Sequence, residues 1–315
     1  MTELSKSLGK RVTIRLREGS GYRDLVGILT SETSLINRQG ELIEFSPLEI
    51  AIWREIQPVP DKAGTGAPQS LRINELESIA NLTWPALQNV ALGGWLLRAT
   101  GKYTMRANSV LPCGAPPYAN PGVPIDKAVA QVVNFYQEQG LTPYFSLPLP
   151  LYSELDRYLE NNGWLVKVKA QVLVADITKR EIAIHEGADF FSAQSPDENW
   201  LSLQGDDGIS EIMQRYPAHY GALYSHQKIV GGCRIAITNR WAVVSRLFIH
   251  EDFRKRGLAR HLMENILNVA LANGATKALL QVSASNESAI ALYKSMGFRF
   301  HHNFQYREYM GSGKK

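Results

Sequence analysis

The most constraining feature of this sequence is an order of predicted elements that occurs twice after residue 70. The second occurrence comprises a strand over residues 242–249, a loop, an amphipathic helix, a strand over residues 278–282 and a helix over residues 288–296. The first comprises residues 107–111, 125–139, 143–147 and 151–162 in the same order. Gly297 follows the last helix and suits a left-handed cap. We therefore expect an α+β chain with two tandem mixed sheets flanked by helices, repeated in structure rather than closely in sequence.

Residues 1–57 predict a separate, smaller unit. Five short β-branched runs occur here between glycine-containing turns, at residues 11–16, 24–30, 34–37, 41–45 and 50–56. Five strands in so short a segment predict a small all-β, SH3-like barrel. Residues 58–70 are rich in Pro, Gly and small polar residues and predict a linker. The tandem copies then occupy residues 71–176 and 177–315, which we call the first and the second half.

Composition and charge narrow the class of protein. Hydrophobic residues make up 44% and charged residues 20% of the 315, which excludes a mainly disordered or fibrous chain. The net charge of +4 is too small to indicate nucleic acid or an anionic membrane as the main partner. The first residues lack the apolar core of a signal peptide, and no apolar run approaches the roughly 20 residues that span a bilayer. We expect a cytoplasmic protein.

The two cysteines, Cys113 and Cys233, predict no disulfide framework and no metal site. They are too far apart in the sequence for the spacing that either arrangement requires. We expect two reduced, partly buried thiols and no metal.

The loop before the amphipathic helix of the second half carries the pattern of an anion site. It reads Arg254-Lys-Arg-Gly-Leu-Ala-Arg260. Gly257 and Ala259 allow close approach to the main chain, whose N–H groups lie at a helix N-terminus and favour a phosphate. A nucleotide-triphosphate loop needs Gly-Lys-Ser/Thr, which is absent here. Taken alone, the loop also fits a solvated, charged helix start.

A second motif gives the loop its context. Asn286-Glu-Ser-Ala-Ile-Ala-Leu-Tyr-Lys-Ser-Met-Gly-Phe298 follows the next predicted strand. Together, Arg-x-x-Gly-x-Ala and Asn-x-x-Ala-x-x-Leu-Tyr-x-x-x-Gly-Phe resemble the GNAT N-acetyltransferases over residues 220–310. The ending His301-His-Asn-Phe-Gln-Tyr-Arg-Glu-Tyr309 is similar to the last strands of that fold. The whole layout resembles bacterial members that carry an SH3-like barrel before a doubled GNAT fold.

The resemblance implies acetyl-CoA as acyl donor and assigns residues to it. Its pyrophosphate would lie on the loop residues Arg254, Lys255, Arg256, Gly257, Leu258, Ala259 and Arg260. Its pantetheine would pair with the backbone of Leu247, Phe248 and Ile249 and contact Asn286, and one backbone N–H would polarise the thioester carbonyl. Tyr293 would protonate the departing thiolate. Asn286 also fits a plain helix cap, and Tyr293 a core position.

The base that would take up the amine proton is not assigned by the resemblance. Some family members have a glutamate on the strand before the loop, whereas residues 241–249 contain no carboxylate. Candidates by chemistry are Asp206, Asp207, Glu211, His219 and Ser245, the last acting through water. His301 and His302 would either line the acceptor pocket or cover a sheet edge.

The first half differs at the position of the loop. Residues 112–124 are longer there, contain no basic residue and include several prolines, which lack amide donors. We therefore expect one acetyl-CoA per chain, with the first half as a wall of the acceptor groove. Trp95, Arg106 and Asn108 would either contribute to that wall or lie in the core of their own half.

These observations predict an N-acetyltransferase that acts on a primary amine by direct attack in a ternary complex. A covalent intermediate on Cys233 is disfavoured because no histidine partner is evident. The alternative is a catalytically inactive acetyl-CoA sensor or adaptor that uses the barrel to recruit a partner. The acceptor stays open among a protein lysine or N-terminus, a polyamine, an amino acid and an aminoglycoside.

Overall fold

The structure is a computed structural model, and it divides into two compact units, Met1–Asp61 and Lys62–Lys315, which are described separately. Both halves defined above, residues 71–176 and 177–315, belong to the larger unit. The residues described are 3–19, 21–37, 39–56, 62–66, 68–101, 104–114, 119–182, 185, 187–205 and 209–311.

The smaller unit is an antiparallel sheet of five strands in the order β4-β3-β2-β1-β5. The strands are β1 (Arg11–Glu18), β2 (Gly21–Ser31), β3 (Ser34–Ile36), β4 (Leu42–Glu44) and β5 (Ile50–Glu55), with short 3₁₀ turns η1 (Glu3–Ser7) and η2 (Pro47–Glu49). Alternate residues of β1 are buried, which places Val12, Ile14 and Leu16 in a small core. The five predicted strands form, but a closed barrel is not confirmed. The sheet is open, because closure requires the edge strands to pair, and the short β4 leads into η2 before β5.

The larger unit contains an 11-stranded mixed sheet in the order β11-β12-β13-β14-β15-β10-β16-β9-β8-β7-β6. From the first half come α1 (Gln69–Leu82), β6 (Gln88–Leu92), β7 (Trp95–Ala99), η3 (Met105–Ala107), β8 (Val110–Pro112), α2 (Ile125–Gln137), β9 (Tyr144–Leu149), α3 (Ser153–Asn161) and β10 (Trp164–Asp176). From the second come β11 (Asp189–Ala193), α4 (Glu198–Ser202), α5 (Ile209–Gln214), β12 (Ala218–Ser225), β13 (Lys228–Thr238), β14 (Trp241–Ile249), η4 (Glu251–Phe253), α6 (Leu258–Ala272), β15 (Lys277–Ser283), α7 (Glu287–Ser295) and β16 (Arg299–Tyr309).

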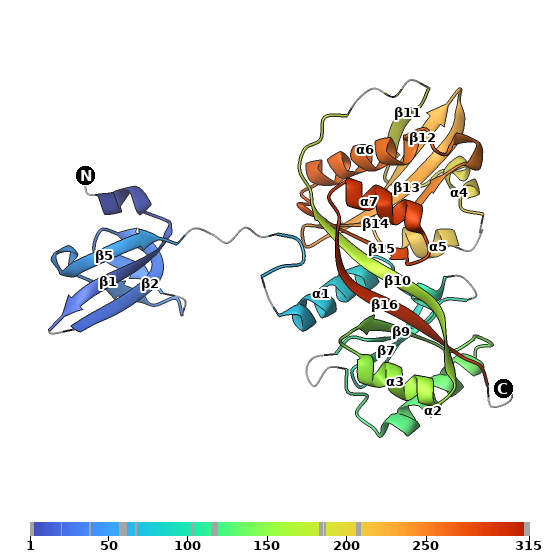
Figure 1. The fold of residues 1–315 in the computed structure, drawn as a ribbon, viewed down its shortest axis with the longest axis horizontal. Coiled ribbons are helices and arrows are strands. Elements are labelled where there is room, and N and C mark those ends of the chain that lie inside the picture. The colour runs from blue at the N-terminus through green and yellow to red at the C-terminus, as the bar shows by residue number, and fades with distance from the viewer. Residues whose placement is uncertain are drawn as a thin grey trace. The chain divides into compact units, whose positions relative to one another are not determined.

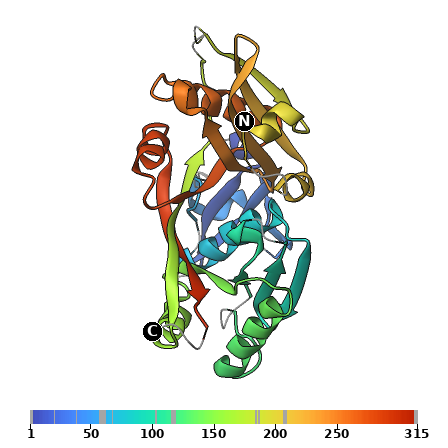
Figure 2. The same ribbon diagram turned by 90° about the vertical axis from the view of Figure 1, so that its right-hand side faces the viewer.

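The two halves exchange a strand at the centre of this sheet. β14 and β15 are parallel neighbours in the second half, as β8 and β9 are in the first. Antiparallel to β15 lies β10 of the first half, and antiparallel to β9 lies β16 of the second. Figures 1 and 2 show β10 and β16 side by side, running from the part that carries α6 and α7 to the part that carries α2 and α3. The division at residue 176 stays a prediction.

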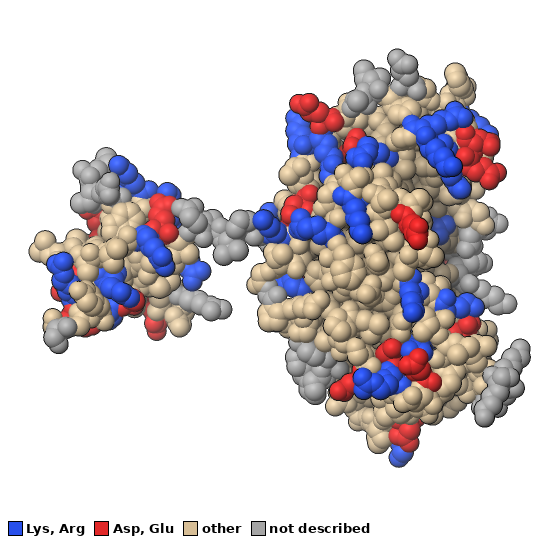
Figure 3. Space-filling view, viewed as in Figure 1, with Lys and Arg blue, Asp and Glu red and all other residues tan. Residues whose placement is uncertain are grey.

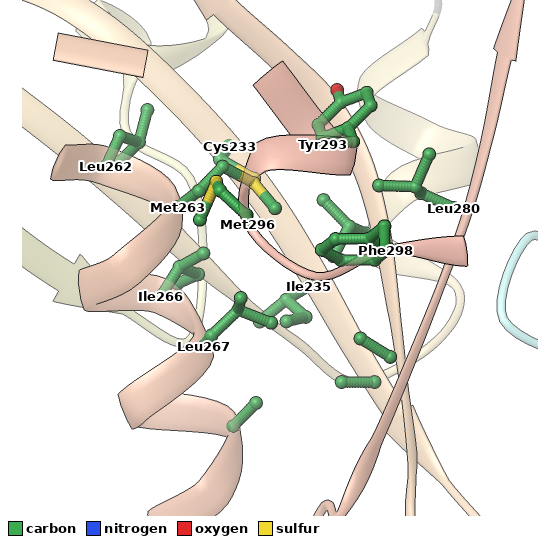
Figure 4. Close-up of a cluster of buried hydrophobic side chains, with 14 of the residues drawn as sticks. Cys233, Ile235, Leu262, Met263, Ile266, Leu267, Leu280, Tyr293, Met296 and Phe298 are labelled. Atoms are coloured by element: carbon green, nitrogen blue, oxygen red, sulfur yellow. The ribbon is translucent and has the colours of Figure 1, made fainter. Parts of the chain in front are cut away.

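Separate cores support the two ends of the sheet. In the second half, α6 buries an apolar stripe that includes Leu262, Met263, Ile266 and Ala270, packed against β13 and β14 (Figure 4). In the first half, α2 buries Ala128, Val129, Val132 and Tyr136. No helix in the described parts of the chain is both long enough and apolar enough to cross a membrane.

Candidate active site

The sheet of the second half opens at one point, between β14 and β15. Their parallel pairing runs from Trp241 and Lys277 to Val244 and Leu280. The pairing of β14 with β13 is irregular between Gly232 and Arg234, and Arg246 on β14 has a φ of +58°, a bulge that bends the strand. Beyond the paired stretch lies a pocket of about 420 Å³.

This opening, which we call the donor pocket, brings together four of the residues predicted to hold acetyl-CoA. Leu247 and Phe248 come from β14, Asn286 precedes α7, and Tyr293 lies on α7. The remaining lining residues are Leu203, Gln204, Val244, Ser245, Arg246, Leu280, Gln281, Val282 and Ser283. Ile249 and the loop residues Arg254–Arg260 do not line this pocket, and they continue from the end of the same strand.

The loop has the backbone conformation that the anion-site prediction requires. Gly257 is the N-cap of α6 in the left-handed region, at φ +79°, and it provides no side-chain cap. Lys255 is left-handed as well, at φ +61°. Within the described chain, no acceptor is recorded for the N–H groups of Leu258, Ala259 and Arg260. The helix therefore begins with free donors and the positive end of its dipole.

The basic side chains of the loop are largely used to shape it. Arg254 Nε donates to the carbonyl of Ile249 at 3.0 Å. Arg256 donates to the carbonyl of Asp252 at 2.8 Å. Arg260 reaches Ser295 Oγ at 2.5 Å, which ties the first turn of α6 to the end of α7. The loop and the donor pocket are thus connected through α7, the helix that carries Tyr293.

Tyr293 fits both roles that the sequence leaves open, a core residue and a proton donor. The side chain is 7% exposed and packs at the edge of the core cluster, with its hydroxyl directed away from Cys233, Met296 and Phe298 (Figure 4). Burial, and to a lesser extent Cys233, raise the pKa of this phenol. A phenol with a raised pKa stays protonated near neutral pH and can act as a proton donor.

Asn286 is a helix cap that also faces the donor pocket. Its Oδ1 accepts from the N–H of Ala289 at 3.2 Å, at the start of α7. The same residue lines the donor pocket. The cap is confirmed, and the contact with pantetheine stays a prediction.

Cys233 is a core residue of β13. It is fully buried, and burial raises the pKa of its thiol to about 12. Its Sγ lies 3.8 Å from the carbonyl oxygens of Arg234 and Ser245. A thiol in this state is not the thiolate that nucleophilic catalysis requires.

A second pocket, of about 260 Å³, adjoins the donor pocket across β14 and β15, and we call it the acceptor pocket. Six residues line both: Val244, Ser245, Arg246, Gln281, Val282 and Ser283. The acceptor pocket is completed by Trp84, Thr104, Met105, Arg106, Val168, Ala170, Phe304 and Tyr306. The first half and the exchanged strands therefore form its outer wall. Arg106 lies in this wall, whereas Asn108 and Trp95 are buried in their own half.

Sequence analysis missed a buried polar network behind the shared wall. Glu77 on α1 is 5% exposed and accepts from Gln281 Nε2 at 3.2 Å. His302 Nε2 lies 3.1 Å from Glu77, and His301 Nδ1 lies 2.8 Å from His302 Nδ1. Burial, followed by the neighbouring His302, lowers the pKa of His301 to about 4. Local sequence gave no signal for this network, because its members come from distant segments.

Of the proposed bases, Ser245 alone among those described lines either of these two pockets. Its Oγ is buried and has no hydrogen-bond partner within the described chain. Glu211 is exposed on α5, and His219 lies on β12 beside another pocket. Asp206 and Asp207 lie outside the described residues. The interpretation that His301 and His302 cover a sheet edge is wrong, because β16 is central in the sheet. Neither side chain is among the residues that line these two pockets, and a role at the acceptor stays a prediction.

Two further features of the larger unit are its surface charge and its potential metal ligands. On the face shown in Figure 3, blue and red side chains alternate over the larger unit. A search of the described residues finds no group of three His, Cys, Asp or Glu side chains arranged to hold a metal ion.

Comparisons with known proteins agree with this geometry. The family model described as probable histone acetyltransferase Rv0428c C-terminal matches residues 71–307. A probable histone acetyltransferase of Mycobacterium tuberculosis is 27% identical over 322 residues, covering 95% of this chain and 94% of that protein. YobR of Bacillus subtilis, an uncharacterized N-acetyltransferase, is 24% identical over 240 residues, covering 72% and 94%.

Solved structures share the fold at low identity. A GCN5-related N-acetyltransferase from Kribbella flavida has a TM-score of 0.60 at 15% identity, covering 77% of this chain and 96% of that chain. A tandem GNAT protein from the clavulanic acid biosynthesis pathway has a TM-score of 0.53 at 12% identity, covering 76% and 89%. Because the family model spans well over half of the sequence, this chain belongs to the GNAT N-acetyltransferases, in the family of the C-terminal region of the probable histone acetyltransferase Rv0428c.

Proposed function

We propose that this protein transfers the acetyl group of acetyl-CoA to a primary amine, by direct attack within a ternary complex. The observation that carries the proposal is the donor pocket, where the splayed strand β14 and helix α7 bring Leu247, Phe248, Asn286 and Tyr293 to one cavity. The free N–H groups at the start of α6 support a pyrophosphate next to it. We also propose a cytoplasmic location and no metal requirement.

The residues act in the following way in this proposal. The amides from Arg254 to Arg260 hold the pyrophosphate, while β14 offers Leu247, Phe248 and Ile249 to pantetheine as a strand edge. One of those N–H groups polarises the thioester carbonyl as negative charge develops on its oxygen. Acetyl-CoA supplies the activated acetyl group. Tyr293 donates its phenolic proton as the thiolate leaves.

We propose that the amine proton leaves through the shared wall of the two pockets. Ser245 Oγ and Gln281 Oε1 are buried acceptors in this wall, with no partner within the described chain. Leaving such an oxygen unpaired costs about 1–3 kcal/mol, which an amine N–H or a bridging water would offset. Glu77 orients Gln281 through its amide and is a positioning residue.

For the smaller unit we propose an SH3-like fold that binds a partner. The strand order, in which β1 joins β2 on one side and β5 on the other, supports it. We also propose that the two halves of the larger unit are tandem GNAT copies, because each contains one parallel strand pair followed by a helix.

Initial-rate kinetics test the proposed activity. Release of free thiol from acetyl-CoA is measured with a panel of amines while both substrates are varied. Intersecting double-reciprocal lines are expected for a ternary complex. Parallel lines would indicate a covalent intermediate instead. Tight acetyl-CoA binding in calorimetry with no turnover on any amine would favour the sensor, and no binding would overturn both.

A further inference from the structure

The lining of the acceptor pocket contains groups that accept and groups that donate hydrogen bonds. In the shared wall, Ser245 Oγ and Gln281 Oε1 are acceptors that lack partners in the described chain, and Arg246 of the same wall donates to Gln204. Trp84 and Arg106, which we call the donor end of the lining, can only donate. Apolar side chains lie around the pocket: Met105, Val168, Phe304 and Tyr306, the last with a hydroxyl.

The donor end has hydrogen-bonding capacity that the protein itself leaves unused. Trp84 is 3% exposed, and its Nε1–H has no partner among the residues described. The Arg106 guanidinium lies over the Trp84 ring at 5.7 Å, and no hydrogen bond or ion pair is recorded for it in the same part of the chain. An indole N–H without a partner and a nearby guanidinium group can together bind a carboxylate.

The turn that carries Arg106 is held rigidly. Thr104 precedes η3 at φ +55°, a left-handed conformation that is unfavourable for a threonine. Asn108 fixes this conformation, since its Nδ2 donates to the carbonyls of Thr100 and Thr104, and its Oδ1 accepts from Thr100 N–H at 2.6 Å. Asn108 therefore positions Arg106 at the pocket.

Two more guanidinium groups lie behind this end with only neutral hydrogen-bond partners recorded. Arg234 is 1% exposed, donates to the carbonyls of Thr83, Met213 and Tyr216, and lies 5.4 Å from the Trp84 ring. Arg98 is 2% exposed and donates to Ser109 and Asn81. Burial lowers the pKa of both, and the charge of Arg106 lowers them further. No carboxylate lines the pocket among the described residues, and the carboxylate recorded as acting on Arg98 is Glu77, behind the shared wall, so Arg106 gives the donor end a positive charge.

On the basis of the acetyl transfer proposed above, we propose that the acceptor is a small amino acid-like molecule, with a carboxylate bound by Arg106 and Trp84 and an amine directed to Ser245 and Gln281. The volume of about 260 Å³ is just below the roughly 300–1,000 Å³ of typical ligand pockets and suits a molecule with one apolar side chain. Polyamines and lysine-rich peptides are disfavoured by the positive end.

The transfer step balances with the groups named. The neutral amine nitrogen forms a bond to the acetyl carbon, and the carbon–sulfur bond breaks. The nitrogen loses one proton to water at the shared wall, and the sulfur gains one from Tyr293, which is later reprotonated by solvent. The products are an N-acetyl amino acid, whose carboxylate remains available to Arg106, and the free thiol of coenzyme A.

Matched pairs of acceptors test this inference on the full chain. Phenylalanine is compared with phenethylamine, leucine with isoamylamine, and both pairs with spermidine and a lysine-rich peptide, using thiol release. We expect the carboxylate to raise kcat/KM at least tenfold within a pair. Arg106→Gln is expected to abolish this ratio while leaving the kcat/KM of the decarboxylated amine within about threefold. Arg157→Gln, which removes an exposed charge on α3, is the control and keeps the ratio.

Binding measurements distinguish failure of this inference from failure of the proposed function. Calorimetry with the amino acids, with and without coenzyme A, reports the pocket whether or not transfer occurs. Carboxylate-dependent binding that Arg106→Gln removes supports the inference even in an inactive protein. Three results would overturn the inference: faster transfer to spermidine or the lysine-rich peptide, a carboxylate preference that survives Arg106→Gln, or no amino acid binding. In each case, thiol release with other amines would leave the proposed acetyl transfer intact.

Discussion

The two strand-to-helix loops of the larger unit occupy equivalent places in the chain and differ in their side chains and in the residue that begins the helix. In the first half, the N–H groups of Cys113 and Gly114 both donate to the carbonyl of Gly94 at 3.1 Å. Gly94 N–H in turn donates to Asn120 at 2.6 Å. The first-turn N–H groups of both α2 and α6 have no recorded acceptor in the described chain, but α2 begins after Pro124 with the acidic Asp126 in its first turn, whereas α6 begins after Gly257 with no acidic residue there.

This difference shows where the capacity to bind an anion arises. Both loops join a parallel strand to a helix, so the fold alone does not distinguish them. The described donors at the start of the first loop, Cys113 and Gly114, are satisfied by Gly94, and the helix after the loop carries a negative charge in its first turn, at Asp126. The second leaves donors free at the positive end of α6 and adds basic side chains around them. We therefore expect one acetyl-CoA per chain, bound by the second loop.

The largest effect is expected from Gly257→Glu. A glutamate there must adopt φ +79° and places a negative charge in the anion site. We expect acetyl-CoA to bind roughly 100- to 1,000-fold more weakly, about 3–4 kcal/mol, in calorimetry. Gly122→Glu is the matched control, since Gly122 has φ +75° and room for a Cβ in the first loop. Equal loss in both variants, or two acetyl-CoA molecules per wild-type chain, would contradict the comparison.

Two buried tyrosines, Tyr293 in the second half and Tyr136 in the first, allow a catalytic role to be distinguished from a structural one. Tyr293→Phe removes the proposed proton donor and is expected to lower kcat about 50-fold with little change in acetyl-CoA affinity. This loss is below the typical range for general acids, because a thiolate whose thiol has a pKa near 8.5 leaves partly unaided.

Tyr136→Phe, at a buried tyrosine of α2 in the first half, is the control. The Tyr136 hydroxyl donates to the carbonyl of Arg98 at 2.9 Å and accepts from its N–H at 3.2 Å. Its loss should cost about 1–3 kcal/mol of stability and lower Tm by a few degrees, while kcat stays within threefold. A normal kcat in Tyr293→Phe would remove Tyr293 from the proposed mechanism.

Asn286 tests whether the cap and the ligand contact can be separated. Asn286→Ser retains a good cap for α7, so the free energy of unfolding should change by less than about 0.5 kcal/mol. The lost amide should weaken acetyl-CoA binding about fivefold in calorimetry. The equivalent helix α3 begins at Tyr152 without a side-chain cap, so only the second half has such a residue. Unchanged affinity would reduce Asn286 to a plain cap.

The elements themselves were largely predictable from sequence, and the reason is local. The apolar periodicity of α2 and α6 and the runs of β9, β14 and β15 are set by neighbouring residues, and the predicted bounds of α2 and of the three strands differ by only a few positions from those observed. The two motifs around Gly257 and Asn286 are equally local. Their proximity could be predicted because the loop and α7 follow the adjacent parallel strands β14 and β15.

The acceptor side was not predictable, because it depends on pairings between distant segments. Nothing in the local pattern of β10 or β16 indicates that each pairs with a strand of the other half. Glu77 on α1 looks like a surface carboxylate, yet its partners Gln281 and His302 are 204 and 225 residues away in the sequence. Arg106 and Trp84 line the same pocket as the shared wall only because these strands pair in this way.

The smallest effect is expected at Cys233, the buried one of the two cysteines; Cys113, in the first half, is half-buried. Burial raises the pKa of both thiols, to about 12 for Cys233, so neither favours the thiolate. Cys233→Ala should keep kcat within threefold and cost about 1 kcal/mol of stability through the small cavity it leaves. A thiol-directed reagent should label Cys113 before Cys233, because Cys113 is partly exposed. Abolished turnover in a folded Cys233→Ala protein would restore the covalent mechanism and make direct attack untenable.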